Sequence, residues 1–136
     1  MIVDTSALLA FFNSVEPLHY EVAQVLTGSG SEPLVVSPYV LAELDYLIAT
    51  RVGVAAELSV LRELAGGAWE LAAFGSGDVV AATAVIDKYS DNDIGLADAS
   101  NVVLARRYDT RTVATLDRRH FSTLRPLNGG QFTILP

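Results

Sequence analysis

The chain has 136 residues, of which 51% are hydrophobic, and a net charge of −7 from 9 basic and 16 acidic side chains. This length suits a single domain, 1–136, and the aliphatic content excludes a disordered chain. The lack of cysteine excludes disulfides and thiolate metal sites and agrees with a cytoplasmic location. No apolar run is long enough for a membrane span, and nothing resembles a signal peptide.

Strand-like and helix-like segments alternate along the chain. The expected strands are Ile2–Val3, 34–37, 68–74, 112–116 and 131–135, and the expected helices are 5–13, 17–28, Pro38–Arg51, 54–64, one starting at 76 or 77, and 96–108. The clearest helix start is Ser37, a capping residue followed by proline. This alternation predicts an α/β fold with a mostly parallel central sheet and helices on both faces, a three-layer α/β/α sandwich.

Two acids follow predicted strands directly. Asp4 comes after the first strand, and Asp117 comes after the strand that contains TVATL. In parallel sheets, ligands bind outside the carboxyl ends of the strands, so we expect both carboxylates at the same edge. Capping of the next helix is the alternative role for Asp4.

Other acids have less distinctive positions. Asp98 lies among small and apolar residues near a helix start, where capping is again the alternative. Glu43 and Asp45 border the same apolar helical stripe on opposite sides, and periodicity does not choose between them. The acids of 87–93 lie in a polar helix end and loop, and we expect them to be solvated.

Carboxylates that converge on one sheet edge repel one another and raise each other's pKa. A bound divalent cation relieves this repulsion, and oxygen ligands without histidine or cysteine select Mg²⁺ or Mn²⁺. The two histidines, His19 and His120, are far apart in sequence, so a histidine-rich metal site is not expected. A hard cation at this edge would support phosphodiester chemistry.

Four segments together resemble the PIN-domain ribonucleases, specifically the VapC-type toxins of bacterial toxin–antitoxin pairs. They are IVDTSALLAFF, VVSPYVLAELDYL, IGLADASNVVLARRY and TVATLDRRHFSTLRP, in the family's order and spanning nearly the whole chain. The resemblance implies a PIN-domain-like fold and an Mg²⁺- or Mn²⁺-dependent endoribonuclease. Such an enzyme cleaves structured RNA, such as tRNA or rRNA, to inhibit translation and is held inactive by a cognate antitoxin.

Carried over by position, the resemblance implies an acidic site of Asp4, Glu43, Asp98 and Asp117 and so selects Glu43 over Asp45. Asp4 and Asp98 would be the principal metal ligands. Glu43 and Asp117 would complete the site, directly or through water, or orient the attacking water.

Three polar residues accompany these acids. Ser6 and Thr115 match the family's small hydroxyl positions near the metal, and local backbone bonding is their alternative role. Asn101 falls one turn after Asp98 on the same helix face, where it can bond a site carboxylate or substrate. A solvent-facing asparagine is the more common outcome for such a residue.

The basic residues are unevenly distributed. Six of the nine lie between Arg106 and Arg125. Arg118 and Arg119 directly follow Asp117, and we expect them to bind RNA phosphates, with a solvated surface cluster as the alternative. Arg51 and Arg62 lie outside this cluster and are expected to contribute little.

Two partners are expected besides RNA: a second copy of the chain and an antitoxin, either of which could cover the apolar face of helix 54–64. The main alternative to an enzyme is a catalytically inactive PIN-like module that binds RNA or protein. Acids in all four motifs argue against it. Haloacid-dehalogenase-type and receiver-like sites are excluded because Thr5 and Ser6 stand where those sites need a further acid.

Overall fold

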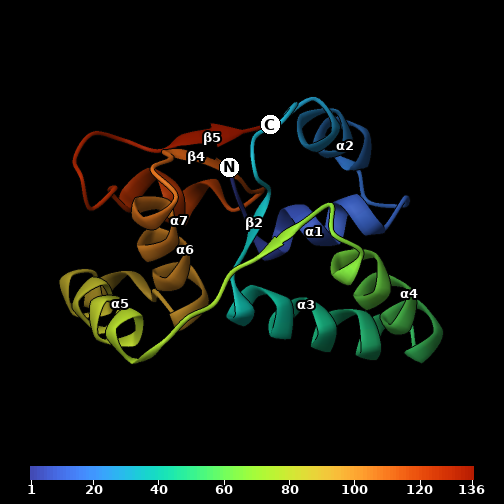
Figure 1. The fold of residues 1–136 in the computed structure, drawn as a ribbon, viewed down its shortest axis with the longest axis horizontal. Coiled ribbons are helices and arrows are strands. Elements are labelled where there is room, and N and C mark those ends of the chain that lie inside the picture. Colours follow the sequence, from blue (N-terminus) through green and yellow to red (C-terminus); the bar gives the residue numbers. More distant parts are fainter.

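The computed structural model describes all residues, 1–136, and its helices and strands alternate as the sequence predicts (Figure 1). The elements are β1 (Ile2–Val3), α1 (Thr5–Phe12), α2 (His19–Thr27), β2 (Val35–Val36), α3 (Pro38–Arg51), α4 (Val54–Ala65), β3 (Glu70–Leu71), α5 (Ser76–Lys88), the 3₁₀ turn η1 (Ser90–Asn92), α6 (Leu96–Arg107), β4 (Thr112–Ala114), α7 (Arg118–Thr123) and β5 (Thr133–Leu135). The short helix α7 is not among the predicted elements. No helix is both long and apolar enough to cross a lipid bilayer.

The five strands form one sheet in the order β3-β2-β1-β4-β5, and every neighbouring pair is parallel. In the central strand β1, Ile2 lies opposite Val35 of β2 and Val113 of β4. This confirms the α/β class and makes the sheet wholly parallel rather than mostly so.

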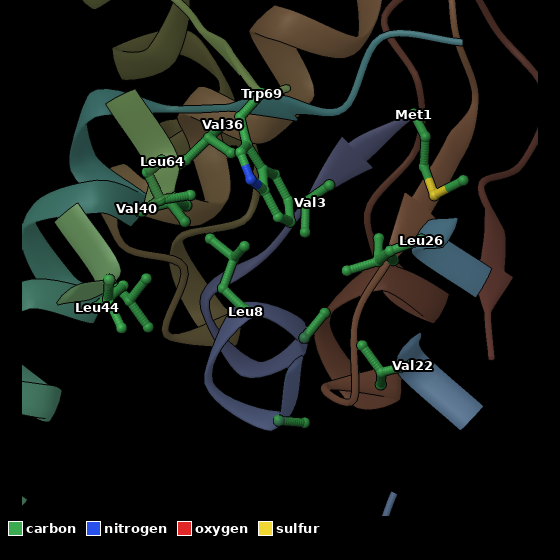
Figure 2. Packing of buried hydrophobic residues seen from close by; sticks show 14 of the residues in the cluster. Met1, Val3, Leu8, Val22, Leu26, Val36, Val40, Leu44, Leu64 and Trp69 are labelled. Atoms are coloured by element: carbon green, nitrogen blue, oxygen red, sulfur yellow. The ribbon is translucent and has the colours of Figure 1, made fainter. Parts of the chain in front are cut away.

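The side chains of alternate strand residues point into two separate hydrophobic cores, one on each face of the sheet. Val3, Val36 and Ala114 point into a core shared with helices α1 to α4, which Figure 2 shows around Leu8 and Trp69. Ile2, Val35 and Val113 point into the opposite core, shared with α5, α6 and α7. Successive side chains of a strand face opposite sides of the sheet. Both faces of this sheet are therefore apolar, and each must be covered by helices. The predicted three-layer sandwich is confirmed.

The start of α3 is anchored to α6. Ser37 Oγ accepts a hydrogen bond from the Tyr39 amide at 3.1 Å, and Pro38 takes the first helical position. The same hydroxyl lies 2.6 Å from Ser100 Oγ of α6, and both serines are completely buried. This contact sets the position of α3, which carries Glu43, relative to α6, which carries Asp98.

The strand order creates a crevice beside the central strand. From β1 the sheet extends through β2 and β3 on one side and through β4 and β5 on the other. The connections that follow β1 and β4 therefore diverge at their carboxyl ends, where ligands bind in open parallel sheets. Asp4 and Asp117 follow these two strands.

Candidate active site

A cleft of about 380 Å³ lies at this edge, and all four acids selected from the sequence line it. Asp4 comes from the end of β1, Glu43 from α3, Asp98 from the first turn of α6, and Asp117 from the loop before α7. Asp45, the alternative to Glu43, instead lies beside Glu57 of α4 and raises the pKa of that carboxyl. The fold thus brings together four carboxylates from distant parts of the chain.

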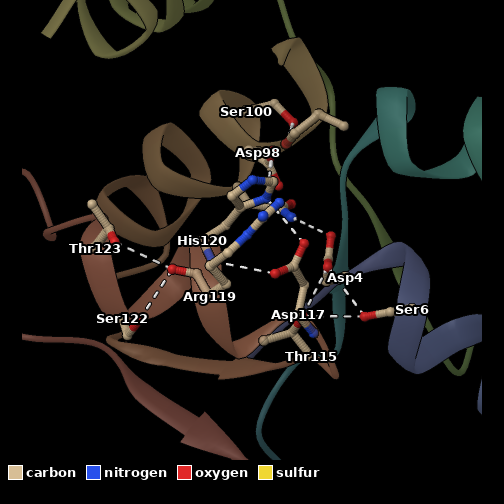
Figure 3. A network of polar contacts seen from close by, with 12 residues as sticks. Asp4, Ser6, Asp98, Ser100, Thr115, Asp117, Arg119, His120, Ser122 and Thr123 are labelled. Carbon is tan, nitrogen blue, oxygen red and sulfur yellow. Dashed lines mark hydrogen bonds and ion pairs between the residues drawn. The ribbon is translucent and has the colours of Figure 1, made fainter. Parts of the chain in front are cut away.

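Asp4 is the most buried of these acids, with only 6% of its surface exposed. Its Oδ1 accepts a hydrogen bond from Asn101 Nδ2 at 3.1 Å, and its Oδ2 accepts one from Thr115 Oγ1 at 2.9 Å. Ser6 Oγ lies 3.3 Å from the same Oδ2 (Figure 3). Although Asp4 occupies the N-cap position of α1, its side chain makes no capping hydrogen bond. Its carboxylate is therefore oriented by the site and not by the helix.

Asn101 does not face solvent. The side chain is completely buried, and its amide donates to Asp4, so the solvent-facing interpretation is wrong. Position in the helix was a poor guide because α6 is packed on nearly every side, with buried residues running from Ala99 to Ala105. Asn101 Oδ1 accepts no hydrogen bond within the chain.

Ser6 and Thr115 combine the two roles considered from the sequence. Their hydroxyl oxygens lie 3.1 Å apart, and both contact the Asp4 carboxylate. Ser6 Oγ also accepts from the Leu116 amide, and Thr115 Oγ1 from the Asp117 amide. These bonds tie the segment after β4 to the start of α1, so they hold Asp117 beside Asp4.

His120 joins the two remaining aspartates. Its Nδ1 lies 3.0 Å from Asp117 Oδ2 and 3.4 Å from Asp98 Oδ2 (Figure 3). Asp117 caps α7 by accepting from the His120 amide at 3.2 Å, which turns the imidazole back toward the cleft. From the sequence, His120 was considered only in excluding a histidine-rich metal site. An acid followed three residues later by histidine is the local signal that was available for this contact.

Burial dominates the electrostatics of the cleft. It raises the pKa of Asp4 to about 6, and the Asp98 and Glu43 charges add to the rise, whereas the Thr115 hydroxyl opposes it. Burial also raises the pKa of Asp98, opposed chiefly by the charge of His120. In both carboxyls the charged form is disfavoured because water is excluded and like charges lie nearby.

The donor set suits a hard divalent cation. The acids facing the cleft offer only carboxylate oxygens, and a bound cation would favour their charged forms. In the arrangement of the structure, however, no three acidic or histidine side chains are close enough to hold one ion together. The raised pKa values of Asp4 and Asp98 and the open oxygen of Asn101 nevertheless fit a site that accepts positive charge.

The arginines predicted to bind substrate lie beside the cleft and not in its wall. The Arg118 guanidinium donates to the backbone carbonyl of Pro136. Arg119 lines a neighbouring hollow of about 230 Å³, which shares His120 with the cleft. Arg51, which lies outside the arginine cluster and was expected to contribute little, is part of the cleft wall. Its place follows from α3, which runs along the cleft and ends at Arg51.

Comparison with known proteins agrees with this geometry. Residues 1–125 match the PIN domain family model. The chain is 63% identical to Ribonuclease VapC26 of Mycobacterium tuberculosis over all 136 residues, which covers the whole of both chains.

Two crystal structures are similar in fold. That of Mycobacterium tuberculosis VapC20, described as a sarcin–ricin loop cleaving toxin, superposes with a TM-score of 0.83 at 18% identity over 99% of this chain and 98% of the other. That of FitAcB from Neisseria gonorrhoeae gives 0.67 at 19% identity over 88% and 89%. The family model matches most of the chain, and Ribonuclease VapC26 is similar to it over its full length. The chain therefore belongs to the PIN-domain family, among its VapC-type toxin ribonucleases.

Proposed function

We propose that this chain, acting as one PIN domain in the cytoplasm, is an Mg²⁺- or Mn²⁺-dependent endoribonuclease that inhibits translation by cleaving structured RNA. The observation that carries the proposal is the cleft at the carboxyl ends of β1 and β4, lined by Asp4, Glu43, Asp98 and Asp117. Of these acids Asp4 is buried and Asp98 and Asp117 are half-buried. Such a group has no stabilising role of its own, because burial of a carboxylate costs desolvation and neighbouring carboxylates repel one another.

Each side chain has a role in this mechanism. Asp4 and Asp98 would hold the metal ion, which when bound supplies charge stabilisation at a phosphoryl oxygen and an activated water. Asn101, Thr115 and Ser6 orient the Asp4 carboxylate through the hydrogen bonds described above. Glu43 and Asp117 would accept hydrogen bonds from the attacking water and so align it with the phosphorus.

The substrate proposal rests on relatives and on charge. VapC20 is described as cleaving the sarcin–ricin loop, which makes this rRNA stem–loop a defined first substrate to test. RNA of this kind is recognised through its shape and backbone. We assign phosphate contacts to Arg118 and Arg119, which directly follow Asp117 in the chain and lie beside the cleft.

The antitoxin proposal rests on an apolar surface whose residues do not line the cleft. A hollow of about 390 Å³ between α1 and α4 is lined in part by Phe11, Phe12, Ala56 and Val60. Val52 and Val54 nearby are each more than 60% exposed. An amphipathic helix of a cognate antitoxin would bury this surface. We also expect a homodimer, which sedimentation at tens of micromolar would detect.

The decisive experiment is incubation of the purified chain, free of antitoxin, with total cellular RNA and with the synthetic sarcin–ricin stem–loop. Mg²⁺, Mn²⁺ and EDTA are compared, and cut ends are mapped. Cleavage at defined sites that requires the cation and is absent in Asp98→Asn is the expected result. Binding of RNA without cleavage under every condition would instead favour the catalytically inactive PIN-like binding module.

A further inference from the structure

One side of the cleft is formed by a single face of α3. Glu43, Leu47 and Arg51 follow one another at intervals of four residues and all line the cleft. Residues so spaced are neighbours on a helix surface. Arg51 is the last residue of α3, so its side chain lies at the end of the cleft farthest along this helix from Glu43.

The Arg51 side chain has no partner within the chain, in contrast to four of the six arginines of the 106–125 cluster; only Arg106 and Arg119 of that cluster also lack one. Arg107 pairs with Asp78, whereas Arg111, Arg118 and Arg125 donate to backbone carbonyls. Arg51 is exposed, and its side chain makes no ion pair or hydrogen bond within the chain. Apart from the imidazole of His120, it is the only basic group in the cleft wall.

The spacing along α3 explains why Arg51 makes no ion pair with Glu43. Eight residues of α helix separate Glu43 from Arg51, a rise of about 12 Å at 1.5 Å per residue. A group bound at Glu43 and a group bound at Arg51 are therefore different groups. A guanidinium presents a fork of N–H donors that matches a phosphate, and it keeps its charge at any physiological pH.

We propose that Arg51 binds a phosphate of the RNA strand that flanks the scissile phosphate on the α3 side of the cleft. Arg119 lies in the hollow on the other side of His120. Basic side chains on both sides of the acids define a path for the strand across the cleft. The contact at Arg51 sets which phosphate lies over the carboxylates, so Arg51 determines the cleavage position. This inference rests on the proposed ribonuclease function.

Stabilisation of the α3 C-terminus is the alternative role for Arg51, since a cation in the last turn complements the helix dipole. A matched control exists in Arg62, an exposed arginine in the last turn of α4 that does not line the cleft. Arg51→Ala and Arg62→Ala thus remove the same charge from equivalent helix positions. If the two variants have equal melting temperatures, a difference between them in RNA binding comes from the position of Arg51 in the cleft and not from helix stability.

The first arm measures binding. Filter binding of the synthetic sarcin–ricin stem–loop across a salt series in EDTA needs no cleavage. Arg51→Ala should reduce the slope of log affinity against log salt by about 0.7 to 0.9, the contribution of one phosphate contact. Arg62→Ala should leave the slope unchanged, and Arg51→Lys should retain most of it. An unchanged slope in Arg51→Ala would overturn the proposal, and Arg51 would then be a candidate contact of a protein partner.

The second arm locates the phosphate. The shortest synthetic RNA that contains a mapped cleavage site is prepared with one neutral methylphosphonate at each position in turn. One substitution beside the scissile phosphate should lower the kcat/KM of the wild type roughly tenfold, as expected for loss of a charged hydrogen bond. Arg51→Ala should be insensitive to that substitution and sensitive to the others. Identical profiles for the two proteins would refute the assignment, whereas absence of any RNA cleavage by the wild type would contradict the proposed function itself.

Discussion

Replacement of Asp4 by asparagine should stabilise the metal-free protein while it abolishes cleavage. Burial and neighbouring carboxylates raise the pKa of Asp4 from 3.8 to about 6. The folded state therefore binds a proton more tightly than the unfolded state, and stability falls as pH rises from about 4 through 6. The difference of about two pKa units corresponds to about 3 kcal/mol of unfolding free energy lost above pH 6.

Asparagine has no charge to desolvate and keeps one carbonyl oxygen for the Asn101 amide. Its own amide would face the hydroxyls of Ser6 and Thr115, which accept as well as donate. Because Thr115 Oγ1 already accepts from the Asp117 amide, we expect part of the gain to be lost. The net stabilisation at pH 7.5 should be about 1–3 kcal/mol, or roughly 3–10 °C in Tm for a domain of this size.

The assay is chemical denaturation of wild type and Asp4→Asn in EDTA between pH 4 and pH 8. The difference in unfolding free energy should be near zero at pH 4 and should grow through pH 6 in favour of the variant. Mg²⁺ should stabilise the wild type and leave the variant unchanged, because only the wild type retains the carboxylate ligand. Asp87→Asn, at an exposed position of α5, is the control and should show no such pH dependence.

Parallel pH profiles for wild type and Asp4→Asn would refute this reasoning. Such a result would mean that Asp4 has an ordinary pKa and that the cleft is well hydrated. Cleavage of RNA by Asp4→Asn at the wild-type rate would contradict the assignment of Asp4 as a metal ligand.

Two further predictions follow from contacts around the cleft. His120→Ala should raise the pKa of Asp98 further, because the charge of His120 opposes the effect of burial on that carboxyl. Carbon NMR of the Asp98 carboxyl in the metal-free protein measures this pKa. An unchanged or lower pKa in the variant would contradict the contact between His120 and Asp98. Ser37→Ala should lower the unfolding free energy by about 1–2 kcal/mol, since it removes the cap of α3 and the buried bond to Ser100. Denaturation beside Ser59→Ala, an exposed serine of α4, tests this, and equal effects would mean that the cap is not stabilising.

Local patterns in the sequence were sufficient for the architecture. Strand-like segments such as Ile2–Val3 and 112–116 alternate with helices that have clear start signals such as Ser37-Pro38, and this alternation predicted the parallel sheet. Because the carboxyl ends of parallel strands share one edge, the positions of Asp4 and Asp117 predicted an acidic site there. The choice of Glu43 over Asp45 came from resemblance to the family, since both residues border the same helical stripe.

Only the tertiary structure decided how residues far apart in the chain meet. Asn101 was misjudged from the sequence as solvent-facing, and the place of Arg51 in the cleft wall was not predicted. Asn101 is buried because α6 packs on nearly all sides, and Arg51 lines the cleft because the Ser37–Ser100 contact helps to hold α3 alongside it. His120 reaches Asp98 through α7, a helix too short to leave a periodic signal. Periodicity reports which face of an element is apolar, whereas the packing of elements determines what each polar side chain contacts.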